Sequence, residues 1–116
     1  MRVHVISDME GVAGIVKWQQ TTGGEKLYDE GRVLYTEEIN AAVRGALDAG
    51  ATEIVVMDCH GAAKGWTFNS LIPDELDPAC EYVVQSSGRS TPSSWSRAAT
   101  PRSSWACTRG RGPATG

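Results

Sequence analysis

The 116-residue sequence has few cysteines, no long apolar run and no excess of basic residues. Its three cysteines, Cys59, Cys80 and Cys107, are too few and too irregularly spaced for a disulfide framework or a zinc knuckle. Reduced thiols and a cytoplasmic location are therefore expected. No apolar stretch approaches the about 20 residues that span a membrane, so no membrane partner is expected. The formal net charge of −3 argues against a polybasic nucleic-acid module.

A second set of absences is concentrated in residues 85–116. This segment has no acidic residue, no Lys and no Ile, Leu, Val, Met, Phe or Tyr, but it has eight Ser, five Arg and two Trp. All fourteen acidic residues precede it, and the net charge is −8 over residues 1–84 and +5 over residues 85–116. We expect one core, built by residues 1–84, and a disordered segment 85–116 that supplies no strand or helix.

Hydrophobic periodicity in the acidic part of the chain predicts a strand, a helix and a second strand. A β-branched run over residues 3–6 ends at an acidic cluster, and apolar residues over 28–49 recur at helical spacing until Gly50. Residues 53–58 form the continuous apolar run typical of a parallel strand, and 82–84 predict a weaker third strand. These elements indicate an α/β fold in three layers, a mainly parallel sheet with flanking helices.

Polar clusters follow both predicted strands: Asp8 and Glu10 after the first, Asp58 and His60 after the second. Because the carboxyl ends of parallel strands line one crevice, we expect these four side chains to converge there. Residues two apart at a strand end point the same way, which pairs Asp8 with Glu10 and Asp58 with His60. Three bare carboxylates would repel one another, so the pattern predicts a divalent cation, and mixed carboxylate and imidazole ligands favour zinc.

Each of these residues also has an ordinary structural explanation. An aspartate after a strand often forms a turn or caps a helix, and a histidine in a glycine-flanked loop is often only hydrogen-bonded. Trp18 and Trp66 follow the two clusters, where they either wall the crevice or pack as aromatic residues commonly do.

Four motifs resemble the DppA-type D-aminopeptidase family of zinc peptidases, in order and at the family's spacing over residues 1–84. They are SDMEGVAG at 7–14, YDEGR at 28–32, TEEIN at 36–40 and DCHG at 58–61. The resemblance implies hydrolysis of short peptides with release of an N-terminal D-amino acid, and a ring-shaped homo-oligomer.

The resemblance also implies roles for particular residues. Asp8, Glu10 and His60 correspond to three of five zinc ligands, and Asp8 to the bridge between two zinc ions. The family's remaining histidine and glutamate ligands and its catalytic residue have no counterpart in this sequence. The resemblance therefore implies a truncated, inactive N-terminal part of the peptidase domain.

Two other functions remain open at this point. In a haloacid-dehalogenase-like phosphatase, Asp8 would be the nucleophile and magnesium the metal, although that family's second acid is normally Asp rather than Glu10 and His60 would have no role. In a non-catalytic remnant, the sheet would offer only an edge for association.

Residues 85–116 have the composition expected of an out-of-frame product. When the last base of each codon is joined to the first two of the next, codons 105–108 spell Gly, then Met, Leu or Val, then His or Tyr. This matches a Gly-Met-His ligand motif that the resemblance implies. We therefore expect a frameshift near codons 84–88, and a genuine Ser/Arg-rich tail is the alternative.

Overall fold

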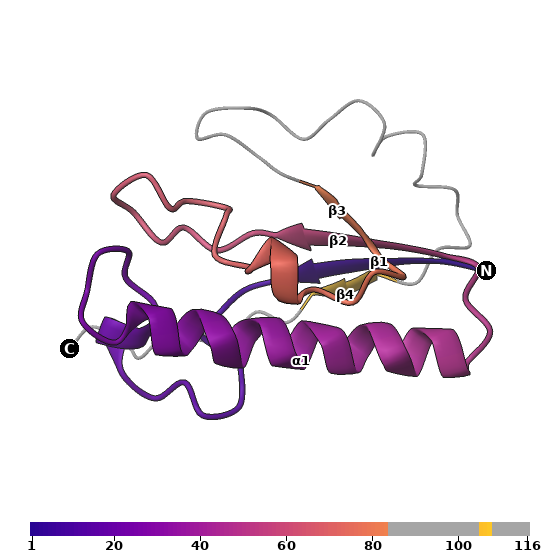
Figure 1. The fold of residues 1–116 in the computed structure, drawn as a ribbon, viewed down its shortest axis with the longest axis horizontal. Helices are drawn as coiled ribbons and strands as arrows, with labels where there is room; N and C mark the ends of the chain where they lie inside the picture. The colour runs from indigo at the N-terminus through magenta and orange to yellow at the C-terminus, as the bar shows by residue number, and fades with distance from the viewer. Residues whose placement is uncertain (84–104, 108–116) are drawn as a thin grey trace.

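The computed structural model describes residues 1–83 and 105–107 of the chain (Figure 1). The strands are β1 (Arg2–Ser7), β2 (Glu53–Asp58), β3 (Glu81–Val83) and β4 (Trp105–Cys107), the long helix is α1 (Tyr28–Asp48), and two short 3-10 helices are η1 (Trp18–Gln20) and η2 (Pro73–Glu75). The predicted order of strand, helix and strand is confirmed. The α/β class is confirmed with it.

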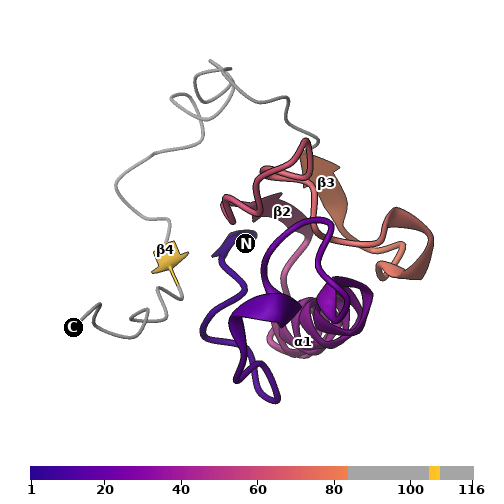
Figure 2. The ribbon, with the colours of Figure 1, turned by 90° about the vertical axis from the view of Figure 1, so that its left-hand side faces the viewer.

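The strands form one sheet in the order β3-β2-β1-β4, and every neighbouring pair is parallel. β1 and β2 are paired along their whole length, from Arg2 opposite Glu53 to Ser7 opposite Asp58. α1 lies along one face of the two central strands (Figures 1 and 2). The carboxyl ends of all four strands therefore lie at the same edge of the sheet, where the segments that follow β1 and β2 begin.

The core lies between α1 and the sheet. Its buried residues include Tyr35, Ile39 and Val43, which are spaced four apart on α1 and so share one helix face. Ile54 and Val56 contribute from β2, again on a single face because alternate strand residues point the same way. Asp58 is the next residue of this alternating series, so its side chain points to the same face of β2 as Ile54 and Val56.

α1 ends where the sequence predicts. Gly50 has a φ of +90°, the left-handed conformation that glycine adopts without strain, and its N–H donates to the Leu47 carbonyl at 2.9 Å. The first turn of α1 is acidic, with Asp29 and Glu30. No helix in the described part of the chain is long and apolar enough to cross a membrane.

β4 corrects one expectation, that residues 85–116 would supply no strand. It pairs in parallel with β1, from Trp105 opposite His4 to Cys107 opposite Ile6. Strand pairing uses main-chain N–H and C=O groups, which a segment without aliphatic side chains still has. Composition alone was therefore the wrong guide at this position.

The other expectations for the C-terminal segment fall on residues 84–104 and 108–116. These residues lie outside the part of the chain that the structure describes. The expected disorder, the frameshift and the division of the chain at residue 84 accordingly stay predictions.

Candidate metal centre

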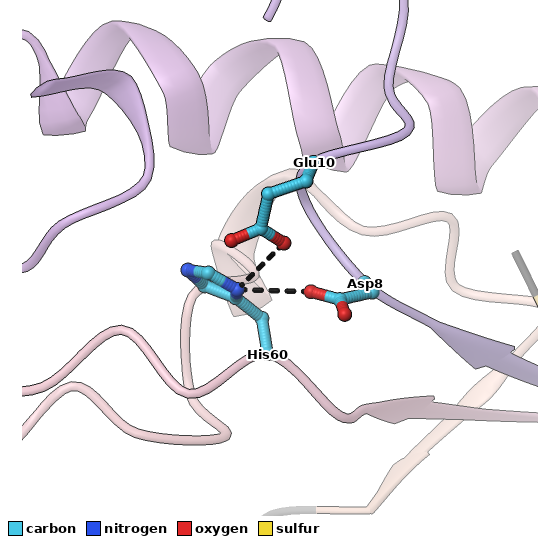
Figure 3. Close-up of side chains that lie close together, drawn as sticks. All are labelled: Asp8, Glu10 and His60. Atoms are coloured by element: carbon cyan, nitrogen blue, oxygen red, sulfur yellow. Dashed lines mark hydrogen bonds and ion pairs between the residues drawn. The ribbon is translucent and has the colours of Figure 1, made fainter. Parts of the chain in front are cut away.

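Asp8, Glu10 and His60 come together at the carboxyl edge of the sheet, and we call them the acid–histidine cluster (Figure 3). One potential ligand atom from each lies within 4.8 Å of the others. His60 Nδ1 is 2.9 Å from Asp8 Oδ1 and 3.2 Å from Glu10 Oε2. Both carboxylates thus converge on the same ring nitrogen, as Figure 3 shows.

The pairing of β1 with β2 brings these residues together. The Cys59 N–H donates to the Ser7 carbonyl at 2.8 Å, which continues the parallel pairing one residue past β2. The two chain segments therefore leave the sheet side by side, one leading to Asp8 and the other to His60. The Met9 N–H donates to Asp8 Oδ1 at 2.8 Å, and the fully buried Met9 side chain anchors the turn.

The orientation of the His60 ring is fixed from its other side. Nε2 lies 2.6 Å from the main-chain carbonyl oxygen of Thr21. A carbonyl oxygen only accepts hydrogen bonds, so Nε2 carries the proton and donates it. In the neutral ring, Nδ1 then presents a lone pair to two carboxylates, and this arrangement is stable only with a cation between them.

The pKa values of His60 and Asp8 also show that a positive charge is favoured within the cluster. Burial disfavours the imidazolium form of His60, but hydrogen bonds to Asp8, Glu10 and the Thr21 carbonyl outweigh it and raise the pKa to about 10. Burial also opposes ionisation of Asp8, yet hydrogen bonds involving His60, Glu10 and the Met9 N–H lower its pKa to about 2. Without a metal, a proton on Nδ1 supplies the positive charge.

Asp58 does not join this cluster, and the expectation that four side chains would converge is wrong in this respect. Its fully buried carboxylate accepts hydrogen bonds from the Tyr35 hydroxyl at 3.1 Å, the His60 N–H at 2.8 Å and the Ser70 N–H. Burial raises the pKa of Asp58, although these hydrogen bonds oppose the rise. Asp58 therefore shapes the turn that carries His60.

The strand register explains this outcome. Asp58 is still within β2, directly opposite Ser7, and the Tyr35 hydroxyl of α1 lies 2.6 Å from the Ser7 Oγ. Ser7 and Asp58 thus share the face of the sheet that α1 covers. Asp8 is the residue after Ser7 and lies beyond the end of β1, outside the sheet.

The segment before α1 is held in place by Gln20, a residue that carries no functional signal in the sequence. Its buried side chain accepts hydrogen bonds from the N–H groups of Val16 and Lys17 at 2.8 and 2.9 Å, and it donates to the Gly14 carbonyl at 3.0 Å. The next residue, Thr21, then presents its carbonyl to His60. A main-chain carbonyl has no signature in a sequence, so this contact was not predictable.

Gly31 allows η1 to lie directly against α1. A Cβ atom at this position would lie 1.9 Å from the Gln20 carbonyl oxygen, a distance that no side chain tolerates. A glycine inside a helix is unfavourable on its own, so Gly31 is the one sequence signal that a close approach occurs here.

The sequence model of peptidase family M55, described as D-aminopeptidase, matches residues 1–98. This chain belongs to the D-aminopeptidase family. The match extends past residue 84, where we expected the family-like sequence to end. Membership of the D-aminopeptidase family favours the peptidase interpretation over the phosphatase.

Two relatives show how much of the family is represented. The D-aminopeptidase of Bacillus subtilis (strain 168) is 30% identical over 83 residues, which are 72% of this chain and 28% of that protein. The solved structure of Zn-dependent D-aminopeptidase DppA from Bacillus subtilis, described as a self-compartmentalizing protease, aligns with a TM-score of 0.67 and 30% identity over 75% of this chain and 30% of its own. The chain thus spans less than a third of the length of these D-aminopeptidases.

The two tryptophans that follow the strands have different surroundings. Trp66 packs in the ordinary way, with the Arg32 guanidinium 4.6 Å from its ring centroid and the Tyr28 ring 5.6 Å away in an edge-on arrangement. Trp18 is half exposed and lines a pocket together with Glu10. Trp18 therefore shares a pocket with Glu10, a member of the acid–histidine cluster.

Proposed function

We propose that Asp8, Glu10 and His60 are zinc ligands of a D-aminopeptidase that releases N-terminal D-residues from short peptides. One observation carries the proposal: His60 Nδ1 faces two carboxylates while its Nε2 is committed to the Thr21 carbonyl. A ring nitrogen and two carboxylate oxygens form a donor set that zinc accepts.

Zinc bound at these residues would polarise the scissile carbonyl and lower the pKa of the attacking water. The chain's own groups hold the geometry for this chemistry. The Thr21 carbonyl fixes the tautomer and orientation of His60, and the Met9 N–H fixes one oxygen of Asp8. In the same proposal, a complete site would hold two zinc ions, and Asp8 would be a ligand of both.

Assembly and location belong to the same proposal. The related structure is described as self-compartmentalizing, and we propose that the complete protein forms a homo-oligomer as well. A cytoplasmic location is part of the same proposal, because three irregularly spaced cysteines do not provide a disulfide framework.

Calorimetric zinc titration of the 116-residue chain tests the ligand assignment. Three protein donors should bind zinc loosely, since two further family ligands have no counterpart in the sequence, and His60→Ala should abolish the binding. Glu30→Gln, a change at an exposed α1 carboxylate, is the matched control and should bind as the unaltered chain does. Tight binding of two zinc ions, or binding that survives His60→Ala, would contradict the assignment.

Activity assays separate the three functions. Zinc-dependent release of D-alanine from a D-alanyl peptide would support the peptidase, although we expect this chain to be inactive because the family's remaining ligands and catalytic residue have no counterpart in its sequence. Magnesium-dependent hydrolysis of a phosphate ester would support the phosphatase instead. A folded chain that binds no zinc would be a non-catalytic remnant.

A further inference from the structure

A pocket of about 260 Å³ adjoins the acid–histidine cluster. Glu10, a member of the cluster, lines the pocket, and so does Thr21, whose carbonyl contacts the ring of His60. A peptide whose N-terminal residue lies at the cluster would therefore have the side chain of that residue near this pocket.

The rest of the pocket wall is largely apolar. It is formed by Ile15, Val16 and Trp18, with Lys17 and Gln19 beside them. Val16 is 82% exposed and Trp18 is 51% exposed, although both are large hydrophobic residues. Single exposed apolar residues are common, but here two of them border one concavity next to a candidate catalytic site.

The pocket wall is preformed. The Gln20 side chain ties together the main chain at Gly14, Val16 and Lys17, and Gly31 allows η1 to rest on α1. A wall fixed in this way needs little ordering when a ligand binds, so apolar contact with it contributes to affinity with little entropic loss.

We propose that this pocket binds the apolar side chain of the peptide's N-terminal residue and that Trp18 is its specificity-determining wall. The inference rests on the proposed function, because it places the peptide's N-terminal residue beside the proposed zinc ligands Asp8, Glu10 and His60. A cavity of about 150 Å³ holds benzene, so a pocket of about 260 Å³ has room for a leucyl or phenyl side chain. The Lys17 ammonium disfavours a cationic side chain.

The test measures binding of amino-acid amides to the zinc-loaded 116-residue chain. D-Leucinamide should bind at least tenfold more tightly than glycinamide, since each methylene in an apolar pocket is worth roughly tenfold or more. D-Lysinamide should bind no better than glycinamide. Trp18→Ala should remove most of the preference for D-leucinamide over glycinamide, and Val16→Ser should reduce the same preference.

Leu47→Ala is the matched control because Leu47 is a partly exposed apolar residue of α1 away from the pocket. Thermal unfolding verifies that each variant is folded. Equal binding of all three amides, or a preference that survives both pocket variants, overturns the proposal. A change in self-association with an unchanged amide preference would also overturn it, since the pocket would then be a contact between copies.

Zinc titration alone separates this inference from the proposed function. If zinc does not bind but D-leucinamide still binds through Trp18, the pocket assignment stands and the metal assignment fails. If zinc binds at His60 and the amides show no dependence on side-chain size, the metal assignment stands and the pocket assignment fails.

Discussion

Asp8 and Asp58 are the same residue type at the ends of two neighbouring parallel strands, and their carboxylates have different surroundings. The Asp8 side chain is 29% exposed, its pKa is lowered to about 2, and it faces His60 Nδ1. Asp58 is fully buried, its pKa is raised, and it accepts hydrogen bonds from Tyr35 and two main-chain N–H groups. The two aspartates differ by one position in the strand pairing, since Asp58 is opposite Ser7 and Asp8 is the next residue after Ser7. This difference makes Asp8 a candidate metal ligand and Asp58 a residue that supports the fold.

The largest expected effect is the loss of stability in Asp58→Ala. This change leaves the His60 and Ser70 N–H groups without an acceptor, whereas the Tyr35 hydroxyl keeps its contact with Ser7 Oγ. Each unpaired buried group costs about 1–3 kcal/mol, so we expect a loss of about 2–6 kcal/mol. Asp8→Ala should cost less, because the Asp8 carboxylate is partly open to water. Urea unfolding of both variants measures the difference, and equal losses would contradict the division of roles.

A smaller effect is expected at Gly31, where η1 packs against α1. Gly31→Ala forces η1 away from α1, and overpacking of this kind costs about 1–3 kcal/mol. Because the Thr21 carbonyl moves with η1, zinc binding should weaken as well.

The matched control for this substitution lies in the same helix. A Cβ atom at Gly45 would have nothing within 4 Å, so Gly45→Ala should stabilise the chain by about 0.5–1 kcal/mol without changing zinc affinity. Thermal unfolding and zinc titration of both variants check the pair. If Gly31→Ala and Gly45→Ala had similar effects on stability and zinc affinity, neither property would depend on the close approach of η1 to α1.

A further expected effect is a dependence of stability on pH in the metal-free chain. The pKa of His60 is raised from an ordinary value of 6.5 to about 10 in the folded state. Its stabilising contribution is therefore fully present below pH 6.5 and is lost as the pH rises toward 10. Urea unfolding between pH 6 and 10 in the presence of a chelator should show this decline, and His60→Ala should lack it. A stability that rises over the same interval would be inconsistent with the protonated ring.

Much of the fold was predictable because local patterns determine it. The apolar run over residues 53–58 coincides with β2, and the helical spacing over 28–49 differs from α1 by one residue. β4 was not predictable from composition, because main-chain pairing with β1 depends on no particular side chain.

The site was predictable only in part, for a related reason. Asp8, Glu10 and His60 follow strands in the sequence, and the parallel sheet brings their ends together. Asp58 lies outside the acid–histidine cluster because it is paired with Ser7 and accepts a hydrogen bond from the Tyr35 hydroxyl of α1. The hydrophobic pattern of a single strand reveals neither contact. The Thr21 carbonyl is a main-chain group and has no sequence signal at all.

The central claim is that His60 binds a metal through Nδ1 while Nε2 keeps its proton. The most direct test is nitrogen NMR of the histidine rings during zinc addition, with His60→Ala used to distinguish His60 from His4. The structure predicts that the His60 Nδ1 signal shifts to a metal-bound position and that Nε2 remains protonated and bonded to Thr21. A metal-bound Nε2, or ring signals that zinc leaves unchanged, would contradict the account.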